Sequence, residues 1–266
     1  MDQAALQALL SDLPLGAVRY FATVGSTNDL AMRWAGAGAP DLSLVVADEQ
    51  TAGRGRLNRR WFTPAGAALA FSLILRPDRR DGISPHFYTA LGALATCDTL
   101  NAALPPMTPA QIKWPNDVLA SRKKLAGVLA EAQWQGEELI ATILGIGINV
   151  APLSVPPDEQ IHYPATCVEA EVQAEIDRWG LLHAVLERLI FWRERLGTQE
   201  FLAALGARLA FRGELVQVSL EDQTPLEGQV LGLTREGRLR LRDRQGALHE
   251  LTGGEINVRR GVSNAR

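Results

Sequence analysis

The chain reads Asp48-Glu-Gln-Thr-Ala-Gly-Arg-Gly-Arg-Leu-Asn-Arg-Arg-Trp61 directly after an apolar run at residues 42–48. The apolar run predicts a buried strand, and the segment rich in arginine and glycine predicts a loop at its end. Guanidinium groups donate paired hydrogen bonds to carboxylate and phosphate oxygens, and glycine allows positive φ and close approach to a ligand. A solvated hairpin tip is the structural alternative. Because no acidic residue lies between Gly53 and Trp61 in a chain of net charge −3, we favour an anion-binding loop.

Further strands and helices are expected around this loop. Runs that are apolar or alternate in polarity predict strands at residues 67–75, 111–114, 127–133 and 139–150. Helical spacing predicts one helix at residues 84–103, starting at Ser84-Pro85, and a helical region at 165–210 with breaks near Gly180 and Gly197. This mixture predicts an α+β fold, a mixed β-sheet with flanking helices.

The pattern changes after Ala210. Short strands with glycine-containing turns are expected at residues 214–220, 226–233, 238–242 and 247–251. So many strands in so short a segment predict a small β-barrel. We therefore expect a catalytic domain at residues 1–210 and a C-terminal β-barrel domain at 211–266.

Composition excludes several classes of protein. With 47% hydrophobic and 21% charged residues, the chain is typical of a soluble globular protein. The net charge of −3 and the lack of aromatic residues among the loop arginines argue against a nucleic-acid partner. Cys97 and Cys167 are expected to be free thiols, and the four histidines have no metal-ligand spacing. Without a signal peptide or a membrane-spanning run, a cytoplasmic location is expected.

The lysines are concentrated in one segment. Of 27 basic residues only Lys113, Lys123 and Lys124 are lysines. Lysine and arginine are not equivalent where a compact charge enters a tight site, so this segment is a candidate for chemistry. Trp114-Pro-Asn-Asp117 predicts a strand that ends in a tight turn. The Asp117 carboxylate in that turn could hold magnesium.

Two further segments allow both a structural and a functional interpretation. Gly145-Ile-Gly-Ile-Asn149 fits a central strand whose glycines allow close packing, or a nucleotide site; no GxGxxG or phosphate loop is present. Gly25-Ser-Thr-Asn28 fits a helix start capped by Ser26 or Thr27, or a polar cluster that binds a ureido or amide group.

Taken together, these segments resemble the biotin protein ligase family. The resemblance rests on their order along the chain: Ser26-Thr27-Asn28, Gln50 to Trp61, Lys113 to Asp117, Lys124 to Gly127, Gly145 to Asn149, and Gly253-Gly-Glu255. It implies a class II synthetase-like catalytic domain followed by an SH3-like barrel. It also implies an enzyme that uses ATP and Mg²⁺ to form biotinyl-5′-AMP and transfers biotin to a lysine of a biotin carboxyl carrier protein domain.

The resemblance also implies roles for individual residues. Lys124, Arg56 and Lys113 would be catalytic, with Lys124 bridging the biotin and phosphate oxygens. Biotin would contact four polar residues: Ser26, Thr27, Asn28 and Gln50. The closing loop would include Gly53, Arg54, Gly55, Arg56 and Trp61. The nucleotide and magnesium side would consist of Lys113, Asn116 and Asp117, with Asn149 near the adenylate and Gly127 beside Lys124. Arg259 would reach the ATP phosphates.

Some features depart from the family pattern or leave alternatives open. Asn58 stands where the family loop has a glycine, and asparagine tolerates left-handed φ. Spacing favours Lys124 over Lys123 as the catalytic lysine. Because the Gly-Ser-Thr-Asn segment starts at residue 25, we expect no N-terminal helix-turn-helix. A lipoate–protein ligase and a non-catalytic biotin-binding protein are the alternatives, and an exposed sheet edge could support a homodimer.

Overall fold

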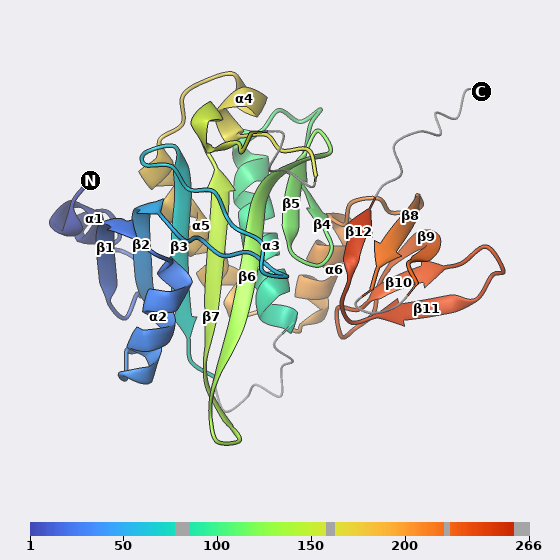
Figure 1. Cartoon of the computed structure of the whole chain (residues 1–266), viewed down its shortest axis with the longest axis horizontal. Coiled ribbons are helices and arrows are strands. Elements are labelled where there is room, and N and C mark those ends of the chain that lie inside the picture. The colour runs from blue at the N-terminus through green and yellow to red at the C-terminus, as the bar shows by residue number, and fades with distance from the viewer. Residues whose placement is uncertain (78–85, 158–162, 221–223, 258–266) are drawn as a thin grey trace.

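The computed structural model describes residues 1–77, 86–157, 163–220 and 224–257. A seven-stranded sheet forms its centre (Figure 1). Its strands, in spatial order, are β1 (Val18–Val24), β2 (Ser43–Gln50), β3 (Ala68–Leu75), β7 (Glu138–Asn149), β6 (Lys123–Gln135), β5 (Asp117–Ala120) and β4 (Gln111–Lys113). The β1–β2 pair is parallel and the other pairs are antiparallel, which confirms the predicted mixed sheet.

Helices cover both faces of this sheet. On one face, α3 (His86–Ala103) packs against β6 and β7, with α5 (Arg178–Arg193) and α6 (Gln199–Ala207) beside it. On the other face, α2 (Thr27–Gly36) packs against β3 and β7. Two short helices complete the set: α1 (Gln3–Leu9), which packs on β1, and α4 (Val168–Val172).

Alternate residues of β2 show how the sheet separates two cores. Leu44 and Val46 belong to the large apolar cluster around α3 and α5, whereas Val45 packs with Ala31 and Ala35 of α2. Successive side chains of a strand point to opposite faces, so a continuous apolar strand indicates burial on both sides. The apolar run before the arginine-rich segment is such a strand, as predicted, and it continues to Gln50.

The structure differs from the predicted elements in three places, and one expected feature cannot be compared. The predicted pattern lacked β1, an edge strand that is half-exposed along most of its length, and β5, which has only four residues. The first helical break is at 173–177, not at Gly180, because Asp177 caps α5 and Gly180 lies inside it. The expected helix start at Ser84-Pro85 lies outside the described residues.

A five-stranded sheet follows the main unit (Figure 1). Its order is β11 (Leu248–Leu251), β10 (Leu239–Arg242), β9 (Leu226–Leu233), β8 (Leu215–Ser219) and β12 (Glu255–Asn257). The predicted small C-terminal β unit is therefore present; within the described ranges β11 and β12 are both edge strands, of four and three residues, so its barrel is not closed. Trp114 joins the two units: it packs in the core of the small sheet and donates from Nε1 to the Gly237 carbonyl at 3.1 Å.

Two expectations from composition can be compared with the structure. Cys97 and Cys167 are buried free thiols, as expected. Among the described helices, none combines the length and hydropathy needed to cross a bilayer.

Candidate active site

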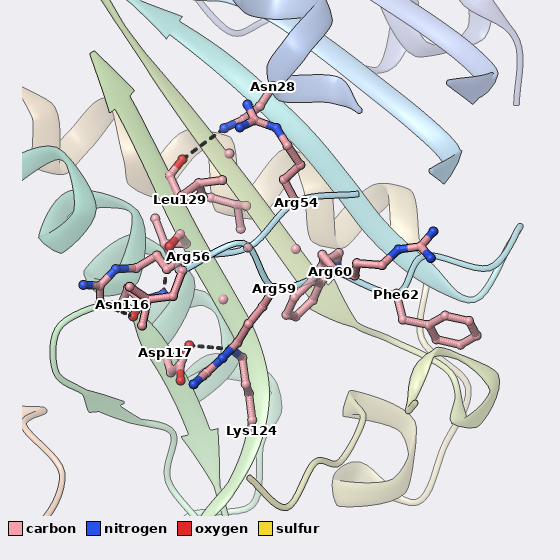
Figure 2. A pocket seen from close by; sticks show the side chains of 18 of the residues that line it. Asn28, Arg54, Arg56, Arg59, Arg60, Phe62, Asn116, Asp117, Lys124 and Leu129 are labelled. Atoms are coloured by element: carbon pink, nitrogen blue, oxygen red, sulfur yellow. Dashed lines mark hydrogen bonds and ion pairs between the residues drawn. The ribbon is translucent and has the colours of Figure 1, made fainter. Parts of the chain in front are cut away.

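A cavity of about 700 Å³ opens on the α2 face of the main sheet. It brings together nearly all the residues predicted from sequence: Ser26, Thr27, Asn28, Gln50, Arg54, Gly55, Arg56, Trp61, Lys113, Asn116, Asp117, Lys124, Gly127 and Asn149. These residues come from α2, the loop after β2, the β4–β5 turn, β6 and β7 (Figure 2). Gly53 lies at the base of the loop, where an added Cβ would be 2.5 Å from the Trp61 carbonyl oxygen. Arg259 lies outside the described residues.

The glycines of β7 form the floor of this pocket. Gly145 and Gly147 face the cavity. Ile146 and Ile148, which alternate with them along the strand, belong to the large apolar core around α3 and α5. A Cβ on Gly145 would lie 2.1 Å from the Asn28 Oδ1, and one on Gly147 would lie 2.2 Å from the Trp61 ring. The segment is therefore both a central strand with close packing and the floor of a site, so the two interpretations offered by the sequence coexist.

A polar network fixes the start of α2 beside this floor. The Gln50 Oε1 accepts from the Thr27 amide at 2.9 Å and from the Thr27 hydroxyl at 3.1 Å. The hydroxyl of buried Ser72 on β3 lies 2.8 Å from Thr27 Oγ1 and 2.5 Å from Asn28 Oδ1, and we assign its single hydrogen to the shorter contact, with Asn28. Ser26 caps the helix by accepting from the Asp29 amide, as predicted. These polar groups hold one another in place, and their pre-organisation gives the pocket a rigid end.

Asn28 uses its side-chain amide within the protein. Its Nδ2 donates to the Glu131 Oε2 at 2.8 Å and toward the Leu129 carbonyl at 3.4 Å, while Oδ1 accepts from Ser72. An amide nitrogen has two hydrogens, and both have protein acceptors here. Both hydrogens are therefore used within the protein, while Oδ1 keeps a second lone pair, and the expected contact of Asn28 with biotin stays a prediction.

The arginine-glycine loop, residues 53–61, lies across the pocket and is fastened by its arginines. Arg54 pairs with both oxygens of Glu131 at 2.9 and 2.6 Å and with Asp29 at 2.8 Å. Arg59 pairs with both oxygens of Glu255 on β12, at 2.6 and 2.5 Å. The sequence showed no acid within the loop, but these acids come from α2, β6 and the small sheet. Arg60 donates to the Thr51 carbonyl at 2.8 Å and points away from the Asp117–Lys124 pair (Figure 2).

The backbone of this loop turns at non-glycine residues. Leu57 and Asn58 have φ of 54° and 57°, in the left-handed region, so Asn58 adopts the conformation expected of it. Gly53 and Gly55 do not have positive φ, contrary to the prediction. Gly53 instead allows the two ends of the loop to come close together. The Trp61 amide donates to the Gly53 carbonyl at 2.9 Å and closes the base of the loop.

Arg56 differs from the other loop arginines because its partner is neutral. It donates to the Asn116 Oδ1 at 3.1 Å, and Asn116 in turn donates to the Val128 carbonyl at 3.0 Å (Figure 2). Burial lowers the pKa of the Arg56 guanidinium. A half-buried cation whose direct hydrogen-bond partner is neutral is suited to bind an anion, because the anion would add a countercharge in direct contact.

Two of the three lysines meet at Asp117. Lys124 Nζ lies 2.6 Å from the Asp117 Oδ1, and Lys113 Nζ lies 3.7 Å from Oδ2. Lys113 also lies over the Tyr163 ring at 4.1 Å, and Lys124 over the Trp61 ring at 5.4 Å. Burial lowers the pKa of the Lys113 ammonium, although the Asp117 charge opposes that shift. Two ammonium groups and Arg56 thus surround one carboxylate and leave the pocket with an excess of positive charge.

Asp117, the expected magnesium ligand, already has two cationic partners in this structure. Magnesium prefers near-octahedral oxygen coordination and is usually held by one or two carboxylates together with substrate phosphates. Here the carboxylate is already the counter-ion of Lys124 and Lys113. Across the described ranges, no group of three or more His, Cys, Asp or Glu residues could hold a metal ion. These ion pairs indicate that Asp117 positions the two lysines, and its expected role as a magnesium ligand stays a prediction.

Comparisons with known proteins agree with this geometry. A model of the Biotin/lipoate A/B protein ligase family matches residues 20–149. The chain is similar to the biotin--[acetyl-CoA-carboxylase] ligase of Paracoccus denitrificans, with 35% identity over 71% of this chain and 78% of that protein. It is also similar to the structure of the biotin protein ligase from Aquifex aeolicus in complex with biotin and ATP, with 29% identity and a TM-score of 0.76 over 92% of this chain and 99% of that one. The chain belongs to the biotin protein ligase family.

Not every member of this family is matched along its whole length. The bifunctional ligase/repressor BirA of Bacillus spizizenii is 39% identical over 63% of this chain, and the match spans 50% of that relative. The arginine-glycine loop and the β7 glycine floor both lie within the residues that the family model matches.

Some residues of this biotin protein ligase site were missed from sequence. Ser72 carries a recoverable signal, since it is a lone hydroxyl inside the apolar strand Ala68–Leu75. Glu131 and Tyr163 carry none, because nothing local in the sequence distinguishes them until the fold brings them to the loop and the lysines. Arg59 was read as an anion ligand, but its acidic partner lies 196 residues further along the chain.

Proposed function

We propose that this chain uses ATP to form biotinyl-5′-AMP and transfers the biotin to a lysine of a biotin carboxyl carrier protein domain. One observation carries the proposal: Lys124, Lys113 and Arg56 meet in a pocket that the arginine-glycine loop covers. Such a group of cations can hold two anionic substrates together. The Aquifex relative, solved with biotin and ATP, supports the choice of both substrates.

The first step joins two anions. A biotin carboxylate oxygen attacks the α-phosphorus of ATP, a carbon–oxygen–phosphorus link forms, and pyrophosphate leaves with the electrons of the broken bond. The barrier is largely electrostatic, so cations fixed in advance lower it. Lys124 would bridge the carboxylate and the α-phosphate; the Asp117 carboxylate, 2.6 Å from its ammonium, supports this role because it fixes the ammonium inside the pocket. Arg56 and Lys113 would bind the remaining phosphate oxygens.

The second step transfers the acyl group. The neutral amine of the carrier lysine attacks the carbonyl carbon of the mixed anhydride, AMP leaves, and the nitrogen loses a proton. Lys124 then stabilises the oxygen that becomes negative at the carbonyl. Until the carrier arrives, the arginine-glycine loop keeps water from the anhydride. The contacts of Arg54, Arg56 and Arg59 support this role, because they fasten the loop at three separate elements.

We also infer that the chain divides near residue 210 into a catalytic domain and a C-terminal domain. The division falls between α6, which ends at Ala207, and β8, which begins at Leu215. The core of the small sheet supports it, since Val216, Val230 and Leu241 pack together there.

The test is acid-dependent exchange of label between pyrophosphate and ATP with purified protein and no carrier. We expect exchange with biotin and none above background with lipoate. Exchange with lipoate instead would make the chain a lipoate ligase. No exchange with either acid, in protein that unfolds cooperatively on heating, would favour a non-catalytic binding protein. A second assay measures transfer of labelled biotin to a purified carrier domain, with a variant in which arginine replaces the acceptor lysine as control.

A further inference from the structure

Glu131 lies outside the main pocket and yet contacts two parts of it. It belongs to β6, and its carboxylate is only 24% exposed. One oxygen, Oε2, accepts both from Asn28 Nδ2 at 2.8 Å and from Arg54 Nη2 at 2.6 Å. The other oxygen, Oε1, accepts from Arg54 Nη1 at 2.9 Å. A single side chain thus connects the start of α2 to the arginine-glycine loop.

The Asn28 end of this connection is rigid. Asn28 is buried, lies against the backbone of Gly145, and accepts from Ser72. A side chain held at all its polar atoms and pressed against a central strand cannot change its rotamer without losing these contacts. The carboxylate that Asn28 contacts is therefore oriented from the floor of the pocket.

The Arg54 end is the exposed end of this connection. Arg54 belongs to the loop, is 40% exposed, and reaches Glu131 and Asp29 across open surface. Paired contacts between arginine and a carboxylate are directional, so the orientation of Glu131 sets the position of the guanidinium. Asp29 makes only one contact with Arg54, at 2.8 Å, and is itself 44% exposed. Glu131 is therefore the acid that can fix Arg54 relative to the floor.

We propose that Glu131 is a positioning residue that couples closure of the arginine-glycine loop to the polar floor of the pocket. The inference rests on the proposed function for its ligand, biotin. Asn28, already fixed against the floor, orients Glu131, and Glu131 holds Arg54 in the closed position over a bound molecule. Loss of the Glu131 charge then weakens retention of biotin and of its adenylate without removing any group that contacts the reacting atoms.

The variant Glu131→Gln tests this coupling, because glutamine keeps an oxygen acceptor for Asn28 and removes the charge that Arg54 binds. We expect the biotin concentration for half-maximal exchange to rise about tenfold, with the maximal exchange rate within about threefold of wild type. Trypsin supplies a readout that does not depend on catalysis, since the loop offers cleavage sites after Arg54, Arg56 and Arg59. Cleavage there should be several times faster in the variant, and added biotin should protect the variant less than wild type.

Asp29→Asn is the matched control, because it removes the other acid on Arg54 and leaves Asn28 untouched. We expect less than a twofold change in both assays. The double variant Glu131→Gln/Arg54→Gln should be no worse than Arg54→Gln alone, since residues that act through one contact are not additive. The proposal is overturned if Glu131→Gln matches wild type in both assays, if Asp29→Asn has an equal effect, or if the double variant shows additive losses. Absence of exchange in wild type would instead overturn the proposed function. In that case the rate of trypsin cleavage without biotin would still test the contact between Glu131 and Arg54.

Discussion

Gly147 of β7 offers a sharp test of the pocket floor. Its ideal Cβ would lie 2.2 Å from Trp61 Cε2 and 2.3 Å from Trp61 Nε1, although its own backbone does not require glycine. Gly147→Ala therefore adds one methyl group directly beneath the indole ring that ends the arginine-glycine loop. The ring must retreat by about 1 Å to reach ordinary contact, or the loop must open.

The size of the effect follows from this overlap. Overpacking by one methyl group costs about 1–3 kcal/mol. The Trp61 ring is only half-buried, so it can move outward. The added methyl group therefore destabilises the closed position of the loop rather than the folded core. The contact between Lys124 and the ring, now 5.4 Å, is disturbed as well. At about 1.4 kcal/mol per factor of ten, the apparent affinity for biotin should fall by roughly tenfold to a hundredfold.

The assay is titration of biotin by calorimetry, supported by the half-saturation of pyrophosphate exchange. Gly206→Ala is the control, because a Cβ on this α6 residue meets no atom within 4 Å. The control should bind biotin like wild type, and both variants should unfold within a few degrees of it. If Gly147→Ala bound biotin with wild-type affinity, the reasoning would be refuted. It requires that the arginine-glycine loop closes over the ligand with the Trp61 ring packed on Gly147.

Three further predictions concern the charged residues. Lys124→Ala should slow pyrophosphate exchange by at least about a hundredfold at saturating biotin, since removal of one fixed donor from a charged transition state typically costs that much. Arg56→Ala should still make the adenylate but release it at least about tenfold faster, as measured by rapid filtration of labelled intermediate. The hydrogen bond from Arg59 lowers the pKa of Glu255 below its usual 4.5, so the contact stabilises the fold above that pH and is lost as pH falls through the lowered value. Between pH 5 and pH 3, Arg59→Gln should therefore lose less unfolding free energy than wild type, as measured by urea titration; an equal loss in both proteins would contradict the pairing.

Much of this site could be predicted because its chemistry is concentrated in short segments. Ser26, the loop arginines and the lysines each carry a local signal of residue type and spacing, and the strands before and after them follow from apolar runs. The alternation of Gly145 and Gly147 with Ile146 also encodes the two faces of β7. Side chains alternate between the two faces of a strand. The sequence alone therefore indicates that one face of this segment carries only glycines and can form the floor of a pocket.

The missed features depend on pairings between distant segments. Glu131 and Glu255 matter because strand register and the placement of the small sheet bring them to arginines far away in sequence. No local pattern predicts such pairs. The open C-terminal sheet has a similar origin, since closure of a barrel depends on whether its two short edge strands reach one another. The ion pairs of Asp117 with its two lysines have the same origin, because strand pairing brings Lys124 to the turn that carries Asp117.

The scarcity of lysine has a practical consequence for handling this protein. Lys113 is only 2% exposed, and Lys124 is held by Asp117, which leaves Lys123 as the exposed lysine of the chain. Dyes, cross-linkers and immobilisation surfaces that react with primary amines will therefore attach mainly at Lys123 and at the amino terminus. In Lys123→Arg such reagents should react mainly at the amino terminus. They do not modify the guanidinium groups of the arginines.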